Sequence, residues 1–557
     1  MSRISGQSGT FSCICLLSPK PHASIQDLPP PPPTSIRPEY QVLYMASAIN
    51  MLKDDILVII FNYYRLANMT DWNVRLGWCK LSHVCRRWRQ LIFETAFHLG
   101  MYILCTYGTP RVDTLDHLPP LQLFVDYQDG RPPAIGWRPR WVTREDELGI
   151  HYALQLPNRV RRINLCLSSS TLDKALLPMD KPFPLLEHLS LSVTGAEINS
   201  PTLPKTFLGP NIRHLSILGI RLPKRLRLLS STLSLITLRL TKIPASGYFQ
   251  PRLLIARLEL LPQLEELSIG FSIPIPRPST ERLLLGKQGA PVMLSNLKSF
   301  TFRGVSAYLE HLVSQMRIPV VEKINITLFN QIAFILPHLS HLVDMTEQIK
   351  PNTAKIISEH NKIAVIMTNS TGLDDNSDDS GAGKPFVLHV MCRPIDWQID
   401  CAAQICSALM LMMAGVENLT LSHKFNRPSD LLPSQIRPVH YDVDSTTWHE
   451  LLTSFIGVKK LLIDHTFSEE LSHALEVDEI GLNPGLLPDL QELVIAYDGI
   501  HRDSVTLFGS FIHARQAAGR PVSFKLLPSL YGSLTRPDVT YYMRLILGRG
   551  SLCAVGG

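Results

Sequence analysis

L-E-H-L-S-L at residues 186–191, followed by I-R-H-L-S-I at residues 212–217, decides the fold of this chain. Both stretches have apolar residues at their first, fourth and sixth positions. Successive side chains of a β-strand point to opposite faces, so the fourth and sixth residues enter a core while the fifth faces outward. A single strand of this kind cannot cover its own apolar face. It requires neighbouring strands that repeat the pattern and share one continuous core.

The same apolar pattern recurs along most of the chain. Seven copies begin between residues 160 and 321 at intervals of 23 to 33 residues, and three more begin between residues 416 and 490. These intervals bracket the period of about 20 to 29 residues that is typical of leucine-rich repeats. We therefore predict an α/β fold in which an irregular leucine-rich-repeat solenoid of parallel strands and helices spans residues 157–548. The copies are Val160-Ile163-Leu165, Leu186-Leu189-Leu191, Ile212-Leu215-Ile217, Leu235-Leu238-Leu240, Leu264-Leu267-Ile269, Leu297-Phe300-Phe302, Val321-Ile324-Ile326, Val416-Leu419-Leu421, Val458-Leu461-Ile463 and Leu490-Leu493-Ile495.

Composition divides the rest of the chain. Residues 1–45 contain a five-proline run and no sustained periodicity, which indicates a disordered tail. A helical domain is predicted over residues 46–108, a connector rich in Pro, Arg and Trp over 109–156, and a short tail over 549–557. Inside the solenoid, the polar and acidic stretch near 369–384 is expected to form a flexible loop.

Four further elements are predicted in the second half of the solenoid. We expect a strand at residues 386–391 and a helix at 399–413, which has apolar residues at helical spacing. A helix at 511–519, closed by a glycine, is expected to lead into a strand at 521–526. This last pair is suited to ending the array.

The predicted helical domain opens with M-L-K-D-D-I-L-V-I-I-F-N-Y-Y at residues 51–64. Residues 56–61 are apolar without interruption, so the helix is hydrophobic beyond a single stripe and needs burial on more than one side. A partner surface would supply the second side. The apolar residues spaced to share one helical face are Leu52, Ile56, Ile59, Ile60 and Tyr63.

A second helical stretch, L-S-H-V-C-R-R-W-R-Q-L-I-F-E, follows at residues 81–94. Its basic residues lie largely away from the apolar face. Two short helices this apolar cannot bury themselves alone. The residues predicted to share the apolar face are Leu81, Val84, Trp88, Leu91 and Ile92.

The two helical stretches resemble the F-box, a docking domain near the N-terminus of ubiquitin-ligase receptor subunits, and especially its fungal form, in which V-C-R-x-W-R recurs. Here that sequence is V-C-R-R-W-R at residues 84–89, whereas Lys53 stands where the family normally has proline. The resemblance implies docking to a Skp-family adaptor, and through it to a cullin ligase, with the solenoid holding an unknown protein substrate. It also implies a subunit with no enzymatic activity of its own. The residues at or behind the adaptor contact would be Leu52, Ile56, Leu57, Ile60, Phe61, Val84 and Trp88.

The outward residue of each repeat forms a column across the predicted sheet. This column is small and polar at first and apolar at its end, so Leu462 and Val494, with Lys460 and Glu492 two residues earlier on the same face, are candidates for substrate binding. Coverage of both apolar residues by a C-terminal segment is an alternative. The column consists of Asn164, Ser190, Ser216, Arg239, Ser268, Thr301, Asn325, Thr420, Leu462 and Val494.

Composition argues against several other classes of protein. The net charge of +6 is small for 557 residues, and no dense basic cluster is interleaved with aromatics, so a nucleic-acid partner is not expected. No apolar run approaches the roughly 18 residues of a membrane span. The ten cysteines include no C-x-x-C pair, which favours reduced thiols in the cytoplasm, the nucleus or both.

No motif for catalysis, metal binding or cofactor binding is found. The chain contains neither G-x-S-x-G nor H-E-x-x-H, and its 19 histidines show no ligand pattern. His188 and His214, on successive strands, are interpreted as surface polar residues, and Cys401 and Cys406 as buried thiols. The alternative to an F-box receptor is a leucine-rich-repeat scaffold or inhibitor without a role in ubiquitin ligation.

Overall fold

The computed structural model contains two compact units, Met1–Ala67 and Asn68–Gly557, and each is described by itself. The predicted tails at 1–45 and 549–557, and all but the first residue of the acidic stretch at 369–384, lie outside the described residues. The structure describes residues 51–67, 77–95, 102–107, 115, 121–130, 141–195, 200–204, 207–223, 227–272, 291–331, 333–346, 349–369, 386–424, 443–475, 486–497 and 507–528.

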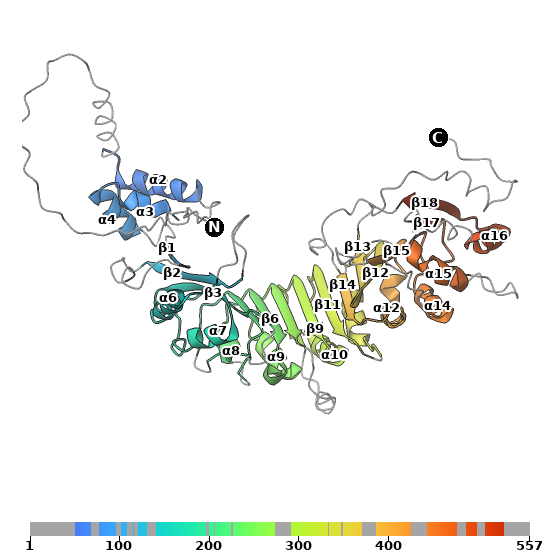
Figure 1. The fold of residues 1–557 in the computed structure, drawn as a ribbon, viewed down its shortest axis with the longest axis horizontal. Helices are drawn as coiled ribbons and strands as arrows, with labels where there is room; N and C mark the ends of the chain where they lie inside the picture. The colour runs from blue at the N-terminus through green and yellow to red at the C-terminus, as the bar shows by residue number, and fades with distance from the viewer. Residues whose placement is uncertain are drawn as a thin grey trace, which may run out of the picture. The chain divides into compact units, whose positions relative to one another are not determined.

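One long sheet dominates the described part of the second unit (Figure 1). Its sixteen strands run in the order β1-β2-β3-β4-β5-β6-β7-β9-β11-β14-β13-β12-β15-β16-β17-β18, while β8 and β10 form a separate pair. The strands are β1 (Tyr102–Cys105), β2 (Gln122–Gln128), β3 (Val160–Leu167), β4 (His188–Val193), β5 (His214–Leu218), β6 (Thr237–Ile243), β7 (Glu266–Phe271), β8 (Val292–Met293), β9 (Ser299–Gly304), β10 (Met316–Arg317), β11 (Lys323–Phe329), β12 (Thr353–Glu359), β13 (Lys362–Thr368), β14 (Phe386–Met391), β15 (Asn418–Lys424), β16 (Lys460–Asp464), β17 (Glu492–Tyr497) and β18 (Ser523–Pro528).

Helices alternate with these strands along the chain. The prediction of an α/β protein is confirmed, with a sheet that is parallel except where β13 pairs with β12 and β14. Helix α2 (Asp54–Ala67) belongs to the first unit. The second unit holds α3 (Gly77–Ser82), α4 (Arg86–Thr95), α6 (Arg144–Leu154), α7 (Ser169–Leu176), α8 (Arg227–Ser231), α9 (Pro251–Leu258), α10 (Ser306–Ser314), α11 (Pro337–Asp344), α12 (Ile395–Ala408), α13 (Met410–Met413), α14 (Ser445–Thr453), α15 (Ser468–Leu475), α16 (Gly509–Ala517) and the short 3-10 turns η2 (Ala245–Gly247) and η6 (His465–Phe467).

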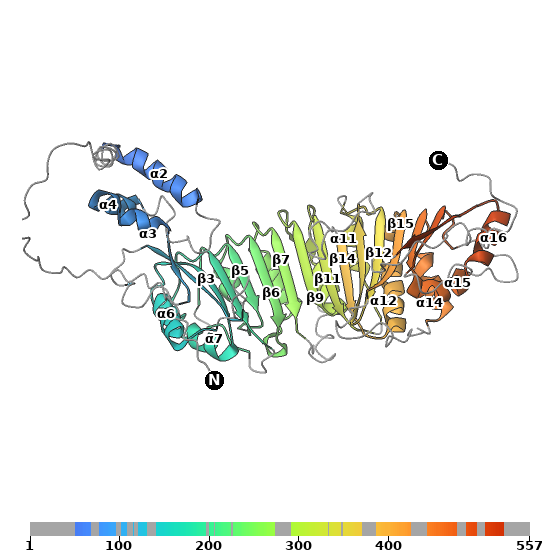
Figure 2. The same cartoon turned by 45° about the horizontal axis from the view of Figure 1, so that its top comes forward.

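The core of the second unit lies between the sheet and the helices on one of its faces. Figure 2 shows the strands side by side. The face of the sheet that lies opposite these helices is named here the helix-free face. It lies on the inside of the curve of the sheet in Figure 1. All thirty apolar residues of the ten predicted copies are at most 2% exposed. Neighbouring copies also stand in register, as Leu189 beside Leu215 and Leu461 beside Leu493 illustrate. Period-two alternation therefore predicted correctly which side chains enter the core.

Two strands and a helix lie where the sequence predicted a connector or a helical domain. β1 and β2 extend the sheet ahead of β3, and α6 follows them, so the sheet begins at Tyr102 rather than near residue 157. In β2, Leu123, Val125 and Tyr127 are buried while their neighbours are partly exposed. This strand carries the same alternation as the later ones, but it lacks the spaced first leucine of the repeat pattern.

An antiparallel hairpin interrupts the sheet where the repeat fades from the sequence. β12 pairs with β15 and β14 pairs with β11, both in parallel, and β13 lies antiparallel between β12 and β14. Residues 363–368 in β13 are all buried. Because both faces of this strand are covered, it shows no alternation, and periodicity alone cannot identify it.

The four elements expected in the second half are close to their predicted positions. β14 matches its prediction of 386–391, and α16 and β18 lie about two residues from theirs. The helix expected at 399–413 begins earlier, at Ile395, and is interrupted at Leu409, where α12 gives way to α13. None of the described helices is both long and apolar enough to cross a membrane.

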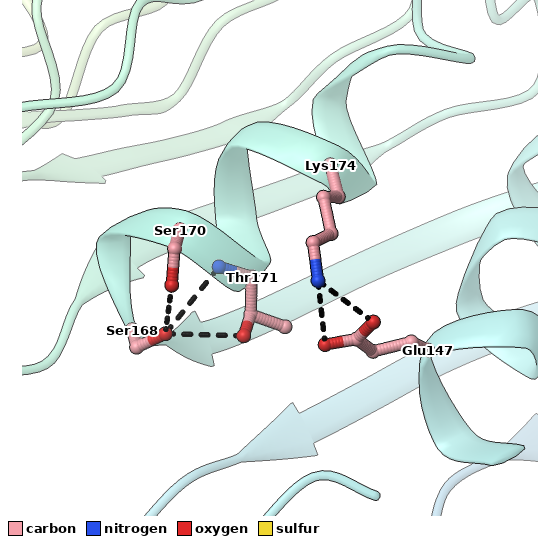
Figure 3. A network of polar contacts seen from close by, with 5 residues as sticks. All are labelled: Glu147, Ser168, Ser170, Thr171 and Lys174. Atoms are coloured by element: carbon pink, nitrogen blue, oxygen red, sulfur yellow. Dashed lines mark hydrogen bonds and ion pairs between the residues drawn. The ribbon is translucent and has the colours of Figure 1, made fainter. Parts of the chain in front are cut away.

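Side-chain hydrogen bonds cap the starts of the two helices that follow β2 and β3. Thr143 and Asp146 form a reciprocal capping box at the start of α6. Figure 3 shows the neighbouring start of α7, where the Ser168 hydroxyl accepts a hydrogen bond from the Thr171 backbone N–H at 3.3 Å. The same view shows Lys174 of α7 paired with Glu147 of α6 at 3.2 Å, an exposed contact that links the two helices.

Replacing Ser168 with alanine is expected to lower the free energy of unfolding by about 1 kcal/mol, because the start of α7 loses its side-chain acceptor. Lys174→Ala removes only an exposed ion pair and is expected to cost at most about 1 kcal/mol, and typically less. Urea titration followed by circular dichroism measures both. A larger cost for Lys174→Ala than for Ser168→Ala would contradict this assignment.

Candidate functional site

Helix α2 displays an apolar stripe to solvent. Ile56, Ile59, Ile60 and Tyr63 are 41%, 52%, 41% and 70% exposed, and their spacing places them on one helical face. On another face Leu57 and Phe61 are fully buried. The helix therefore has both a buried apolar face and an unpaired one, as its uninterrupted apolar run predicted.

The start of α2 explains the position of Leu52. The backbone N–H of Leu57 donates to the Lys53 carbonyl at 3.1 Å, and the helix begins at Asp54. The acidic residues Asp54 and Asp55 occupy its first turn, where they oppose the positive end of the helix dipole. Leu52 lies before this start and is half-buried, so it does not share the helical stripe, contrary to the prediction.

The second helical stretch is broken rather than continuous. α3 ends at Ser82 and α4 begins at Arg86, so residues 81–94 do not present the single apolar face that the sequence suggested. The Cys85 thiol accepts from the Trp88 backbone N–H at 3.4 Å, and the Arg89 guanidinium donates to the Ser82 carbonyl at 2.9 Å. These two bonds satisfy a helix start and a helix end on either side of the break.

The residues predicted to share one apolar face over 81–94 differ in their exposure to solvent. Leu81, Leu91 and Ile92 are buried, Trp88 is half-buried and Val84 is 59% exposed. Among the residues implied for the adaptor contact, Ile56, Ile60 and Val84 are therefore accessible. Leu57 and Phe61 can only lie behind such a contact.

The candidate substrate patch at the end of the sheet is an ion-pair cluster. Lys460 and Glu492 stand opposite each other in β16 and β17, with Nζ and Oε2 3.2 Å apart, and Lys525 of β18 approaches Glu492 Oε1 at 2.6 Å. Partial burial alone would raise the pKa of the Glu492 carboxyl, but the two ammonium groups outweigh it and lower that pKa. Leu462 is half-buried, and Val494 is 1% exposed. Val494 stands beside Leu462 in the register, between the core residues Leu493 and Ile495, so its burial agrees with the alternative that this outward residue is covered.

A second cluster of polar residues lies on the helix-free face, near the start of the repeats. The rings of His188 and His214 stack with centroids 4.4 Å apart, and both residues are half-buried on adjacent strands in register. Arg162 of β3 extends the same row and is exposed. In this region the predicted column included only the last outward residue of each repeat. The residue two positions earlier points to the same face of the strand. The period of two along a strand could therefore have identified the row of Arg162, His188 and His214.

The described residues offer little for covalent or metal chemistry. Among them, no group of three or more His, Cys, Asp or Glu side chains is arranged to hold a metal ion. Cys401 and Cys406 are buried, as predicted. Burial raises the pKa of the Cys105 thiol to about 12, and it raises that of Cys406 as well, so both remain protonated and weakly nucleophilic.

Comparison of the chain with models of known protein families and with curated proteins gave no match.

Proposed function

We propose that this protein is an F-box receptor subunit of an SCF-type ubiquitin ligase. In this proposal the helices at residues 51–95 dock a Skp-family adaptor, and through it a cullin ligase, while a leucine-rich-repeat-like solenoid holds a protein substrate. The observation that carries the proposal is the exposed apolar stripe of α2, which gives an otherwise amphipathic helix a second apolar face with no partner in the described chain.

The sequence of the second helical stretch supports the same function. The V-C-R-R-W-R stretch that resembles the fungal F-box begins in the break between α3 and α4 and continues into α4, where Cys85 caps the start of the helix. Val84, at the break, is exposed. Val84 is apolar and exposed and Trp88 is aromatic and half-buried, and side chains of both kinds are suited to the core of a protein interface.

The ten buried copies support a solenoid for the remainder. Stacked parallel strands whose apolar residues stand in register share a core only with their neighbours, which is the arrangement of leucine-rich repeats. A solenoid leaves a long polar face for binding proteins. The described cysteines are free, which supports residence in the cytoplasm, the nucleus or both.

The protein would perform no covalent step itself in this proposal. It would hold the substrate near the ubiquitin-charged enzyme of the complex and raise the effective concentration of the substrate's lysines there. This role needs two binding surfaces and no catalytic group.

Gel filtration of the purified chain with the Skp-family adaptor of its own host tests the proposal. Co-elution as a stable complex is the expected result. A folded chain that elutes separately from the adaptor would contradict the proposal and favour the repeat scaffold or inhibitor without a role in ubiquitin ligation.

A further inference from the structure

Basic and imidazole side chains gather on the helix-free face of β3 to β6. Arg162, His188 and His214 stand in one row across β3, β4 and β5. The two rings stack, and His214 Nδ1 lies 3.2 Å from the Thr237 hydroxyl of β6. Arg239, also on β6, is exposed on the same face, next to Ser216 in the register.

Arginine side chains outnumber carboxylate side chains around these strands. Arg161 pairs with Glu187 at 3.0 Å, and Arg239 forms a two-pronged contact with Glu266. The guanidinium groups of Arg162 on β3 and of Arg213, which immediately precedes β5, are also exposed, and neither forms an ion pair with the described part of the chain. The surface thus retains uncompensated positive charge.

The same positive charge acts on the two imidazoles. Burial, followed by His214 and Arg162, lowers the pKa of His188 to about 4. Burial, followed by neighbouring arginines, also lowers the pKa of His214. Both rings are therefore neutral at pH 7, in a place where an anion would favour their protonation. The charged groups that act on the pair are Arg161, Arg162, Arg213, Arg239 and Glu187.

Small polar residues form the next row along the same strands. Asn164, Ser190 and Ser216 stand in register across β3, β4 and β5, and Ser190 and Ser216 are half-buried. Their short side chains leave the strands accessible to an extended peptide and offer hydrogen-bonding groups to it. Basic side chains thus border a strip of the sheet whose side chains are short and polar.

We propose that the helix-free face of β3 to β6 binds an extended, acidic segment of a partner protein through Arg162 and the stacked His188–His214 pair, with Arg213 at the adjoining start of β5. As an assignment of substrate class, this inference rests on the proposed function. The interspersed carboxylates of Glu187 and Glu266 favour a peptide with spaced negative charges over a nucleic acid. A nucleic-acid backbone carries a charge at every unit and gains affinity by neutralising consecutive phosphates.

Binding should depend on pH in a defined direction. A bound carboxylate opposes the arginines and raises the pKa of both imidazoles above the values of the free protein. Protonation and peptide binding then reinforce each other. Affinity therefore increases as the pH falls through the bound-state pKa values, until the carboxylates of the peptide themselves protonate near their usual pKa of about 4.3.

Fluorescence anisotropy with the full-length chain alone tests this inference. The probe is a labelled peptide of alternating Glu and Ser, and a peptide of alternating Gln and Ser is its neutral counterpart. We expect the acidic peptide to bind, the neutral one not to bind, and the affinity of the acidic peptide to rise between about pH 7.5 and about pH 5.5. Added salt should weaken binding, because the charges are exposed.

Two double variants locate the binding site. Arg162→Gln with Arg213→Gln should weaken binding roughly three- to tenfold, whereas Arg144→Gln with Arg317→Gln, which removes as much exposed charge elsewhere, should leave it unchanged. His188→Gln with His214→Gln should remove most of the increase at low pH.

Three results would overturn the inference: no binding of the acidic peptide, equal binding by both arginine double variants, or tighter binding of a single-stranded RNA than of the peptide. None of these measurements includes the adaptor. Failure of adaptor docking and failure of peptide binding are therefore separate results.

Discussion

A chain carrying Ile59→Asp and Ile60→Asp is expected to lose the proposed complex with a Skp-family adaptor. The two isoleucines are 52% and 41% exposed at the centre of the α2 stripe. Burial of the exposed half of each side chain contributes about 1 kcal/mol, and a carboxylate in its place would be buried without a partner at a further cost of several kcal/mol. Affinity should fall at least about a hundredfold, which abolishes co-elution on gel filtration.

The same double variant should remain folded, because exposed positions contribute little to stability. Circular dichroism and the urea midpoint should match those of the unmodified chain. Ile335→Asp with Ile456→Asp is the matched control, since these isoleucines are 72% and 55% exposed outside the helical region, and it should retain the complex. Leu57→Ala is a poorer probe, because Leu57 is fully buried and its loss would also destabilise the protein. A complex that survives Ile59→Asp with Ile60→Asp would remove α2 from the docking surface.

Replacing Phe302 with alanine is expected to lower the free energy of unfolding by about 3–5 kcal/mol. Phe302 of β9 is fully buried and its ring lies 5.9 Å from that of Tyr308 and 6.5 Å from that of Phe271, between centroids. The cavity left by the ring cannot close easily, because the neighbouring strands are held in register on both sides. Urea unfolding followed by circular dichroism measures the change.

Thr301→Ala is the control for this prediction. Thr301 precedes Phe302 on the same strand but is half-buried on the helix-free face. Its replacement should change the free energy of unfolding by no more than about 0.5 kcal/mol. Equal losses from the two substitutions would contradict the assignment of Phe302 to the core and Thr301 to the open face.

Local alternation in the sequence determined the faces of the repeats. Leu238 and Leu240 flank Arg239, and the structure buries the two leucines while the arginine is exposed. Such a prediction needs only neighbouring residues, because the direction of a side chain along a strand follows from the backbone itself. The exposed stripe of α2 was predictable in the same way, from an apolar run too wide for one helical face.

Tertiary structure alone decided which strands meet and which surfaces remain open. Nothing in the sequence of β13 shows that it lies between β12 and β14, because a strand buried on both faces resembles any apolar run. The burial of Val494 and the stacking of His188 on His214 likewise depend on residues far apart in the chain. Periodicity in the sequence indicates which side of each helix or strand is buried. Strand order, burial at the ends of the sheet and the grouping of charges depend instead on pairings between distant segments. No local sequence pattern contains those pairings.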